Sequence, residues 1–407
     1  MKQLLLISAF LIALVSCNTD NKKGNPFIDE NIEFAVRQIG NEIEVIEASD
    51  QFLNPVTLRK DGSVYYCGYA DWRSGFFPGS VWYLYELTGD EKYAELAHKY
   101  SKAIEEAKNV TDHHDVGFMV YCSFGNGYRL TNNSEYPDII VQAAKSLATR
   151  FRPEAGVIQS WDVNQERRER GWECPVIIDN MMNLELMFEA TKFSGDPTYH
   201  DIAIAHADRT LAEHFRPDGS CYHVIDYSLE DGSVRHRHTA QGYAHESAWS
   251  RGQAWAIYGY VVCYRETGEQ KYIDQAIKTF EFMRDHKNAP EDLIPYWDMD
   301  APDMSEDDRY AAYPDNRDAS SASIIASALY EMSTMNLTNS EQYKDYADRM
   351  MESLASPAYR AELGTNGNFL LKHSVGSIPH NSEIDVPLNY ADYYFLEALK
   401  RKKDIER

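Results

Sequence analysis

The hydrophobic positions of this chain recur with a helical period over most of its length. Apolar residues at spacings of three and four predict amphipathic helices, and a similar short punctuation separates several of them. In one copy a helix ends at Thr267-Gly268, and the next begins with Glu269 and then Tyr272. Glycine favours the left-handed cap that ends a helix, and an acidic first turn suits the dipole of the next helix. Each unit is therefore predicted to be a helical hairpin.

The periodicity predicts about twelve helices in six pairs. The expected pairs are 28–48 with 75–88, 90–108 with 114–123, 134–151 with 177–193, 196–214 with 249–267, 269–286 with 319–335, and 340–355 with 390–402. Strand signals are few, and residues 221–232 are typical of a hairpin loop. No linker follows residue 26. The chain is therefore predicted to be one all-α domain, an (α/α)6 barrel in which six helical hairpins close into a ring.

Four stretches are unusually apolar and rich in small residues, which suits an inner ring of buried helices. They are residues 80–87, 181–190, 254–262 and 320–329. Polar and aromatic signals fall just before or at the starts of the inner helices: Asp71, Trp72, His114, Asp115, Asp179, residues 241–251, Arg317, Asp318 and residues 389–392. If the inner helices run parallel, these ends converge at one mouth of the barrel. The helix dipoles there would favour an anionic ligand.

The composition narrows the possible partners. Of the 407 residues, 43% are hydrophobic and 13% are aromatic, so the chain can build a large core. The formal net charge of −24 argues against nucleic acid or an anionic membrane surface, because both require a basic protein surface. A small anionic ligand held by a few local cations remains compatible with this charge.

Residues 1–17 resemble a bacterial lipoprotein signal peptide. A basic start precedes a short apolar stretch, which is too short to span a membrane as a helix. The sequence Leu14-Val15-Ser16-Cys17 resembles a lipobox, which implies cleavage before Cys17 and lipidation of that cysteine. Residues 18–27 are then a polar tether, and residues 28–403 form the barrel. A plain secretory signal is the alternative.

Asp179 is the one carboxylate in an apolar stretch, residues 174–184, that leads into a predicted inner helix. A carboxyl group in such surroundings loses hydration and holds its proton more tightly, which suits a general acid near neutral pH. The alternative is that Asp179 only caps the helix. Asp115, preceded by His114, is a second carboxylate at an inner-helix start, although such residues are often caps or surface groups. Two carboxylates in one enclosed site push their pKa values apart, so that one stays protonated.

Other candidates have a structural alternative as well. Arg251, between Trp249 and Trp255, is either a stacked structural arginine or a guanidinium that binds a substrate carboxylate. Trp72, Trp161 and Trp255 are either sugar-stacking walls or core residues. His223 lies on the predicted hairpin loop, within possible reach of the mouth. The acidic residues near 300–318 lack the calcium-loop pattern, and no metal is predicted.

Several motifs together resemble the unsaturated glucuronyl hydrolases of glycoside hydrolase family 88. The resemblance runs from about residue 30 to 400, in the order of the family. The matching motifs are Asp71-Trp72-x-x-Gly75-Phe76, His114-Asp115-x-Gly117-Phe118, Ala155-Gly156-x-Ile158-Gln159-x-Trp161, Ile177-Ile178-Asp179, Tyr222-His223, Gln241-Gly242, Trp249-x-Arg251-Gly252-Gln253-Ala254-Trp255, Tyr296-Trp297-Asp298, Arg317-Asp318-x-Ser320 and Asp392-Tyr393-Tyr394. The family fold is an (α/α)6 barrel, which agrees with the hairpin pattern.

The resemblance implies roles for individual residues. Asp179 is the expected catalytic acid and base, and Asp115 the second essential carboxylate. The expected substrate-binding residues are His114, His223, Gln241, Arg251, Trp255, Trp72 and Trp161. The implied substrate is an oligosaccharide, left by a polysaccharide lyase, with an unsaturated uronic acid at its non-reducing end. The implied reaction is hydration of the C4=C5 double bond, which requires no cofactor.

Three alternatives remain open at this stage. The related unsaturated rhamnogalacturonyl hydrolases share the fold and chemistry, although the context of His223, Gln241 and Arg251 favours the glucuronyl type. An ordinary inverting glycosidase on the same barrel would cleave saturated substrates, and a non-catalytic lipoprotein would only bind glycans. Residues 124–133, 301–316 and 369–387 are expected to form subsites for the second sugar. The N-terminal signal predicts an enzyme of the bacterial cell envelope that is lipid-anchored, faces the periplasm and meets the membrane only through Cys17.

Overall fold

The computed structural model describes residues 25–407. The expected signal peptide, the lipidated Cys17 and the tether up to residue 24 lie outside the described residues. The last residues assigned to the tether, Pro26 and Phe27, belong to the first helix. In the described part of the chain, no helix combines the length and the apolar character needed to cross a membrane.

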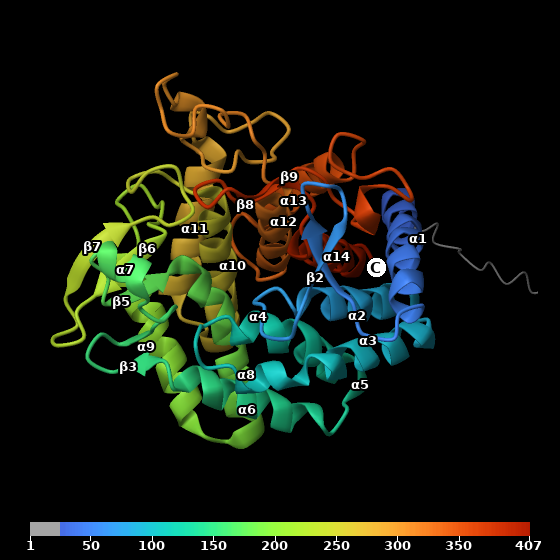
Figure 1. Cartoon of the computed structure of the whole chain (residues 1–407), viewed down its shortest axis with the longest axis horizontal. Coiled ribbons are helices and arrows are strands. Elements are labelled where there is room, and N and C mark those ends of the chain that lie inside the picture. The colour runs from blue at the N-terminus through green and yellow to red at the C-terminus, as the bar shows by residue number, and fades with distance from the viewer. Residues whose placement is uncertain (1–24) are drawn as a thin grey trace, which may run out of the picture.

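The described helices form two concentric rings, and the chain passes around them in sequence order from blue to red (Figure 1). The outer ring consists of α1 (Pro26–Glu47), α3 (Glu91–Ala103), α6 (Tyr136–Ala148), α9 (Pro197–Glu213), α11 (Gln270–Asp285) and α13 (Ser340–Leu354). The inner ring consists of α2 (Phe76–Thr88), α4 (Val116–Val120) continued by η2 (Tyr121–Gly125) and α5 (Asn126–Thr131), η3 (Ile178–Asn183) with α8 (Leu184–Ser194), α10 (Ser250–Thr267), α12 (Ala319–Ser333) and α14 (Asn389–Ile405). The last inner helix, α14, packs against the first, α2, so the ring closes. The predicted (α/α)6 barrel is confirmed.

Burial explains which helices lie inside. In α10 every residue from Ser250 to Cys263 is buried, as expected for a helix surrounded by neighbours. In α11 the buried residues are confined to one face, as in an amphipathic helix against a core. Gly89, Gly195 and Gly268 end α2, α8 and α10 in the left-handed conformation. These are the hairpin breaks that the punctuation predicted.

Nine short strands add four small antiparallel sheets within residues 25–407. They are β1 (Asn54–Leu58) with β2 (Val64–Cys67), β3 (Phe151–Arg152) with β4 (Val157–Ile158), β5 (Cys174–Ile177) with β6 (Val224–Tyr227) and β7 (Val234–His238), and β8 (Ser374–Ser377) with β9 (Ser382–Val386). The hairpin expected around residues 221–232 corresponds to β6–β7. The pattern of residues did not predict β1–β2 or β8–β9. The remaining short helices are η1 (Glu105–Asn109), α7 (Gln165–Glu169), η4 (Ala301–Asp303) and η5 (Asn366–Asn368).

Candidate active site

A cavity of about 250 Å³ opens where the inner helices begin. Its lining comes from segments far apart in the sequence, including the starts of α10 and α14 and the hairpin β8–β9: Trp72, Asp115, Trp161, Ile177, Asp179, Gln241, Arg251, Gly376, Ser377, His380, Ser382, Glu383 and Tyr390. The predicted convergence of the inner-helix N-termini at one mouth is therefore confirmed. The structure brings together six of the nine residues expected at the site: Asp115, Asp179, Gln241, Arg251, Trp72 and Trp161.

Asp179 is held where strand β5 passes into the inner ring. The backbone N–H of Ile178 donates to the His223 carbonyl at 3.0 Å, and the chain then turns through η3, which carries Asp179. This turn packs very closely on its neighbours. A Cβ atom on Gly117 of α4 would lie 2.6 Å from Oδ1 of Asn183, and one on Gly259 of α10 would lie 2.4 Å from Cβ of Met181. Glycine at both positions is what allows η3 to sit between α4 and α10.

The Asp179 carboxyl group is buried and incompletely hydrogen-bonded. Its Oδ2 atom has no hydrogen-bond partner among the described residues. Burial raises the pKa of Asp179 to about 6, and the nearby Asp115 carboxylate adds to this, whereas His114 and Arg251 oppose it. A carboxyl group with this pKa is protonated in an appreciable fraction of molecules near neutral pH. The geometry therefore agrees with a general acid, and an ordinary solvent-exposed cap would show neither feature.

His223 faces Asp179, with 3.7 Å between its Nε2 and Oδ2 of the aspartate. The Nδ1 atom of His223 accepts hydrogen bonds from the backbone N–H groups of Ala240 (3.0 Å) and Gln241 (3.2 Å). Nδ1 therefore carries no proton, and in the neutral ring the proton sits on Nε2. Burial, with help from the positive charge of Arg251, holds the pKa of His223 well below its usual range. The neutral ring thus directs an N–H group at Asp179.

Asp115 lies beside two histidines. Nε2 of His114 is 3.2 Å from Oδ1 of Asp115, and the His113 ring lies on the other side of the carboxylate. Burial alone would raise the pKa of Asp115, but the contacts with His114 and His113 outweigh it and hold this pKa well below its usual range. Asp115 is therefore ionised at pH values at which Asp179 still carries its proton, the division that two carboxylates in one site were expected to show. His114 itself is fully buried and acts on the cavity through Asp115.

Arg251 lines the cavity, but its terminal nitrogens are already engaged. Nη1 donates to Oδ2 of Asp318 at 3.2 Å and to the Val375 carbonyl, while Nη2 donates to Oε1 of Gln241 at 2.9 Å and to the Gly376 carbonyl at 2.6 Å. The guanidinium also lies over the Trp249 ring, 4.6 Å from its centroid. Only Nε lacks a partner among the described residues. Both interpretations of Arg251 thus apply in part. As a structural residue it holds Gln241 and β8 in place. To a ligand in the cavity it offers a positive charge and one N–H group, because its two terminal nitrogens are not free to bind a carboxylate.

The three candidate tryptophans differ in their placement. Trp72 and Trp161 line the cavity. Trp161 also stacks on Trp172, with 6.2 Å between ring centroids and 23° between planes. Trp255, in contrast, is fully buried against Phe118 and Tyr394 and does not line the cavity. Its expected role as a sugar-stacking wall is corrected to a core role, because it lies one helical turn deeper than Arg251.

The hairpin β8–β9 and the start of α14 add residues that the sequence did not single out. Glu383 forms an ion pair with Arg73, and burial raises the pKa of Glu383. Gly376 leaves room for this carboxylate, since a Cβ atom there would lie 2.4 Å from its Oε2. The hydroxyl group of Tyr390 is buried without a partner among the described residues. Residues 369–387 thus reach the site as expected, and Tyr390 lies in a stretch already marked as polar at an inner-helix start.

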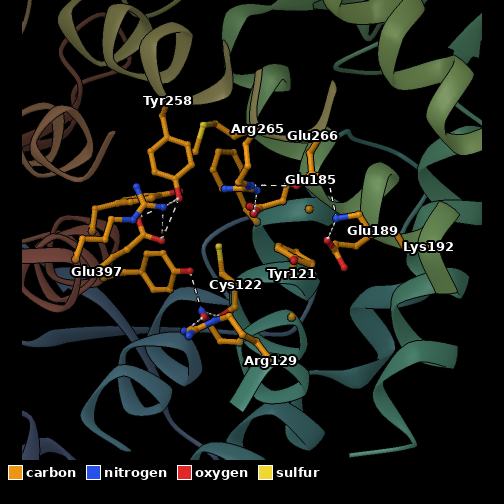
Figure 2. Close-up of a pocket in the computed structure, with 18 residues that line it drawn as sticks. Tyr121, Cys122, Arg129, Glu185, Glu189, Lys192, Tyr258, Arg265, Glu266 and Glu397 are labelled. Carbon is orange, nitrogen blue, oxygen red and sulfur yellow. Dashed lines mark hydrogen bonds and ion pairs between the residues drawn. The ribbon is translucent and has the colours of Figure 1, made fainter. Parts of the chain in front are cut away.

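A second cavity, of about 550 Å³, lies at the opposite ends of the inner helices (Figure 2). Charged and phenolic side chains point into it, among them Glu185, Arg265, Tyr258 and Glu397. Part of the segment 124–133, which was expected to be a sugar subsite, lies here instead, with Gly125, Asn126 and Arg129 in the lining. This expectation is corrected: the inner helix that begins at α4 runs on through η2 and α5, away from the mouth that holds Asp179.

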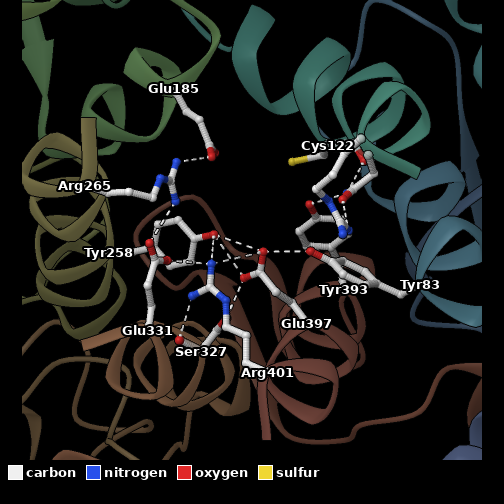
Figure 3. A network of polar contacts seen from close by, with 12 residues as sticks. Tyr83, Cys122, Glu185, Tyr258, Arg265, Ser327, Glu331, Tyr393, Glu397 and Arg401 are labelled. Carbon is white, nitrogen blue, oxygen red and sulfur yellow. Dashed lines mark hydrogen bonds and ion pairs between the residues drawn. The ribbon is translucent and has the colours of Figure 1, made fainter. Parts of the chain in front are cut away.

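The polar groups around this second cavity satisfy one another (Figure 3). Glu397 accepts hydrogen bonds from the hydroxyl groups of Tyr83 (2.7 Å), Tyr258 (3.0 Å) and Ser327. Arg401 forms an ion pair with Glu331 at 2.7 Å and approaches Glu397 at 3.7 Å. Arg265 links Glu331 to Glu185. In this network each of the two arginines pairs with at least one carboxylate, which offsets the cost of burying these charges.

Residues 25–407 contain no group of three or more His, Cys, Asp or Glu side chains arranged to hold a metal ion.

The chain was compared with known proteins. Residues 61–404 match the family model described as Glycosyl Hydrolase Family 88. An "unsaturated glucuronyl hydrolase" of Formosa agariphila is 48% identical over 336 residues, which cover 82% of this chain and 80% of that protein. An "unsaturated chondroitin disaccharide hydrolase" of Streptococcus agalactiae is 30% identical over 383 residues, 92% of this chain and 91% of that protein. A solved structure described as an "unsaturated glucuronyl hydrolase specific for heparin" superimposes with a TM-score of 0.86 at 42% identity, covering 94% of this chain and 98% of the other.

Proposed function

Because the chain belongs to Glycosyl Hydrolase Family 88, we propose that it removes the 4,5-unsaturated uronic acid from the non-reducing end of oligosaccharides released by a polysaccharide lyase. The chain is a glycoside hydrolase, and its relatives are named for unsaturated glucuronyl substrates. The resemblance noted from the sequence motifs is thereby confirmed. Glycosaminoglycan fragments are the substrate class that we favour, since the names of two of these relatives specify chondroitin and heparin.

One observation carries the catalytic assignment: Asp179 presents a buried carboxyl group with a raised pKa in the cavity at the mouth, and its Oδ2 atom has no hydrogen-bond partner among the described residues. We assign it the role of general acid and base. The C4=C5 bond of the substrate is a vinyl ether, so protonation at C4 places positive charge on C5 and the ring oxygen. An ionised Asp115 beside the cavity is suited to stabilise that charge.

The remaining steps follow from the same two groups. Once Asp179 has given its proton to C4, its carboxylate accepts a proton from the water that attacks C5. The product is a hemiketal, which opens and releases the shortened sugar chain. Since no displacement occurs at C1, the separation of the two carboxylates does not report on retention or inversion as it does in ordinary glycosidases. His223 would donate its Nε2–H group to Asp179 once substrate binding closes the present distance of 3.7 Å.

The experiment that tests this function is turnover of unsaturated disaccharides made by lyases, followed as loss of the ultraviolet absorbance of the double bond. A panel with and without sulfate would define the preferred glycan. Hydrolysis of saturated disaccharides alone would instead identify an ordinary inverting glycosidase. Binding without turnover of any member of the panel would contradict the proposal and favour a glycan-binding protein.

We also propose that the enzyme is anchored in the bacterial cell envelope, facing the periplasm. The lipobox-like sequence that ends at Cys17 supports the anchor, because a multiply acylated cysteine is a stable membrane attachment. The first residues after Cys17 include only Asp20 before two lysines, so no acidic export tag is evident. A net charge of −24 suits small anionic products better than an intact polyanion.

A further inference from the structure

A groove of about 620 Å³ lies beside the active-site cavity. We call it the side groove, and its lining includes Arg170, Trp172, His238, His245, Arg309 and Tyr310. The two spaces share their walls. Gln241 lines the cavity while Ala240 and Gly242 line the side groove, and Trp161 of the cavity stacks on Trp172 of the groove. A sugar chain that leaves the cavity past Gln241 would enter this groove.

The side groove holds hydrogen-bond donors that the protein does not use. Nδ1 of His238 accepts from the Trp172 indole N–H at 2.8 Å, and Nδ1 of His245 accepts from the backbone N–H of Thr239 at 3.0 Å. The proton of each neutral ring therefore lies on Nε2. The two rings stack with 4.3 Å between centroids, and neither Nε2 has a hydrogen-bond partner in residues 25–407. The side groove is thus lined by two stacked imidazole rings, each with one N–H donor that the described residues do not use.

Two arginines add positive charge. Arg170 lies over the Trp172 ring, 5.1 Å from its centroid, and its one ion pair within the described chain is with the exposed Glu166. Arg309 is exposed and rests on the Tyr310 ring at 5.1 Å, with no ion-pair partner in the described part of the chain. One carboxylate, Asp308, also lines the groove, but it accepts a hydrogen bond from the Tyr243 hydroxyl group at 2.6 Å. In a protein of net charge −24, this concentration of donors is unusual.

We propose that the side groove binds an anionic group, a carboxylate or a sulfate, on the third sugar of the oligosaccharide or on a sugar beyond it. This inference rests on the proposed function. Planar guanidinium groups and imidazole N–H donors suit such oxyanions. The groove would therefore make the enzyme favour longer, acidic chains over the disaccharide.

The test compares kcat/KM for an unsaturated tetrasaccharide with kcat/KM for the disaccharide of the same glycan. The double variant Arg170→Gln/Arg309→Gln should lower this ratio roughly three- to tenfold, as expected for two partly exposed ion pairs. Raising the salt concentration should lower the ratio of the native enzyme too. Using one unsulfated glycan, with carboxylates only, and one sulfated glycan identifies the bound group.

The matched control is Arg237→Gln. Arg237 is exposed on the neighbouring strand β7, pairs with Glu213 and does not line the groove, so the ratio should not change. An unchanged ratio in the double variant, or an equal fall in the control, would overturn the side groove as a binding site. Failure of the native enzyme to turn over the tetrasaccharide while it hydrolyses the disaccharide would overturn it as well. Absence of turnover on both substrates would instead count against the proposed function.

Discussion

Nε2 of His223 lies 3.7 Å from Oδ2 of Asp179, and neither atom has a hydrogen-bond partner among the described residues. Buried polar atoms are normally hydrogen-bonded. Two unpaired atoms that face each other beside a cavity therefore indicate a functional site, since they do not stabilise the fold. The distance is longer than a hydrogen bond, and substrate binding would need to move the two groups only slightly to close it.

Replacement of Asp179 by Asn should remove nearly all turnover. The amide cannot donate a proton to C4 or accept one from water, and general acid–base catalysis is typically worth about 10²–10⁴-fold in rate. The measurement is kcat for the unsaturated disaccharide. Asp226→Asn is the matched control, because Asp226 is a buried aspartate on β6 that does not line the cavity. If Asp179→Asn kept more than about a tenth of the native rate, Asp179 would not be the general acid.

The same variant should be more stable than the native enzyme at pH 7.5. The pKa of Asp179 is raised from 3.8 to about 6 in the folded state. A raised pKa means that the contribution of this group to stability is present below pH 3.8 and is lost as the pH rises through 6. At pH 7.5 the ionised carboxylate therefore lowers the free energy of unfolding by at most about 3 kcal/mol. Asn carries no charge at this position, so the variant avoids this cost. Thermal melting at pH 7.5 and pH 4 checks this, and an equal change in Tm at both pH values would contradict it.

The rate should depend on pH through the fraction of Asp179 that is protonated. Arg251 should influence the pH at which the rate declines. With a pKa of about 6, kcat/KM should decline above that pH, by about tenfold per pH unit once the acid form is scarce. Arg251 lowers this pKa, so Arg251→Met should move the decline to higher pH. The variant should also raise KM, because Gln241 and the β8 carbonyl groups lose their donor.

Arg251→Lys provides the control for this prediction. A lysine keeps the charge but cannot reproduce the four bonds of the guanidinium. The decline with pH should therefore stay near its native position while KM still rises. If Arg251→Met left both the pH profile and KM unchanged, Arg251 would play no part in the site.

The helices of the barrel and the positions of the two carboxylates could be predicted, because both depend on patterns among residues that are close together in the sequence. The glycine breaks, acidic first turns and 3.6-residue periodicity are properties of neighbouring residues, and they placed the inner-helix starts correctly. Asp179 and Asp115 lie at such starts, so their common location followed from the parallel arrangement of the helices. Trp255 shows the limit of this reasoning. It lies four residues after Arg251 on the same helix, and the sequence cannot tell which turn reaches the cavity.

The features that escaped prediction depend on contacts between distant segments. The carbonyl groups that occupy Arg251 belong to Val375 and Gly376, more than a hundred residues away. The partner of Glu383 is Arg73, from the other end of the chain. Neither contact leaves a periodic trace in the sequence. The hairpin β8–β9 was missed for a different reason. Its strands are only four and five residues long and form a two-stranded sheet, so they show too little alternation to be predicted as strands.

The lipid anchor can be tested by replacing Cys17 with alanine. The native protein should appear in the membrane fraction and the variant in the soluble fraction, since the proposed anchor attaches its acyl chains to this cysteine. Protease added to intact cells should spare the native protein if it faces the periplasm. Recovery of the native protein in the soluble fraction would rule out the anchor. Digestion in intact cells would rule out the periplasmic orientation and leave the anchor standing.

The network at the far end of the barrel should contribute to stability and not to catalysis. Arg401 is paired with Glu331 and lies close to Glu397, and all three side chains are largely buried (Figure 3). Arg401→Met would leave these carboxylates short of a counter-charge, and breaking a buried pair typically costs about 3–5 kcal/mol. We expect a lower Tm with little change in kcat/KM, because Arg401 lines the second cavity and not the one that holds Asp179. The control is Arg407→Met, an exposed position on the same terminal segment. A fall in kcat/KM without a fall in Tm would mean that the two ends of the barrel are coupled in catalysis.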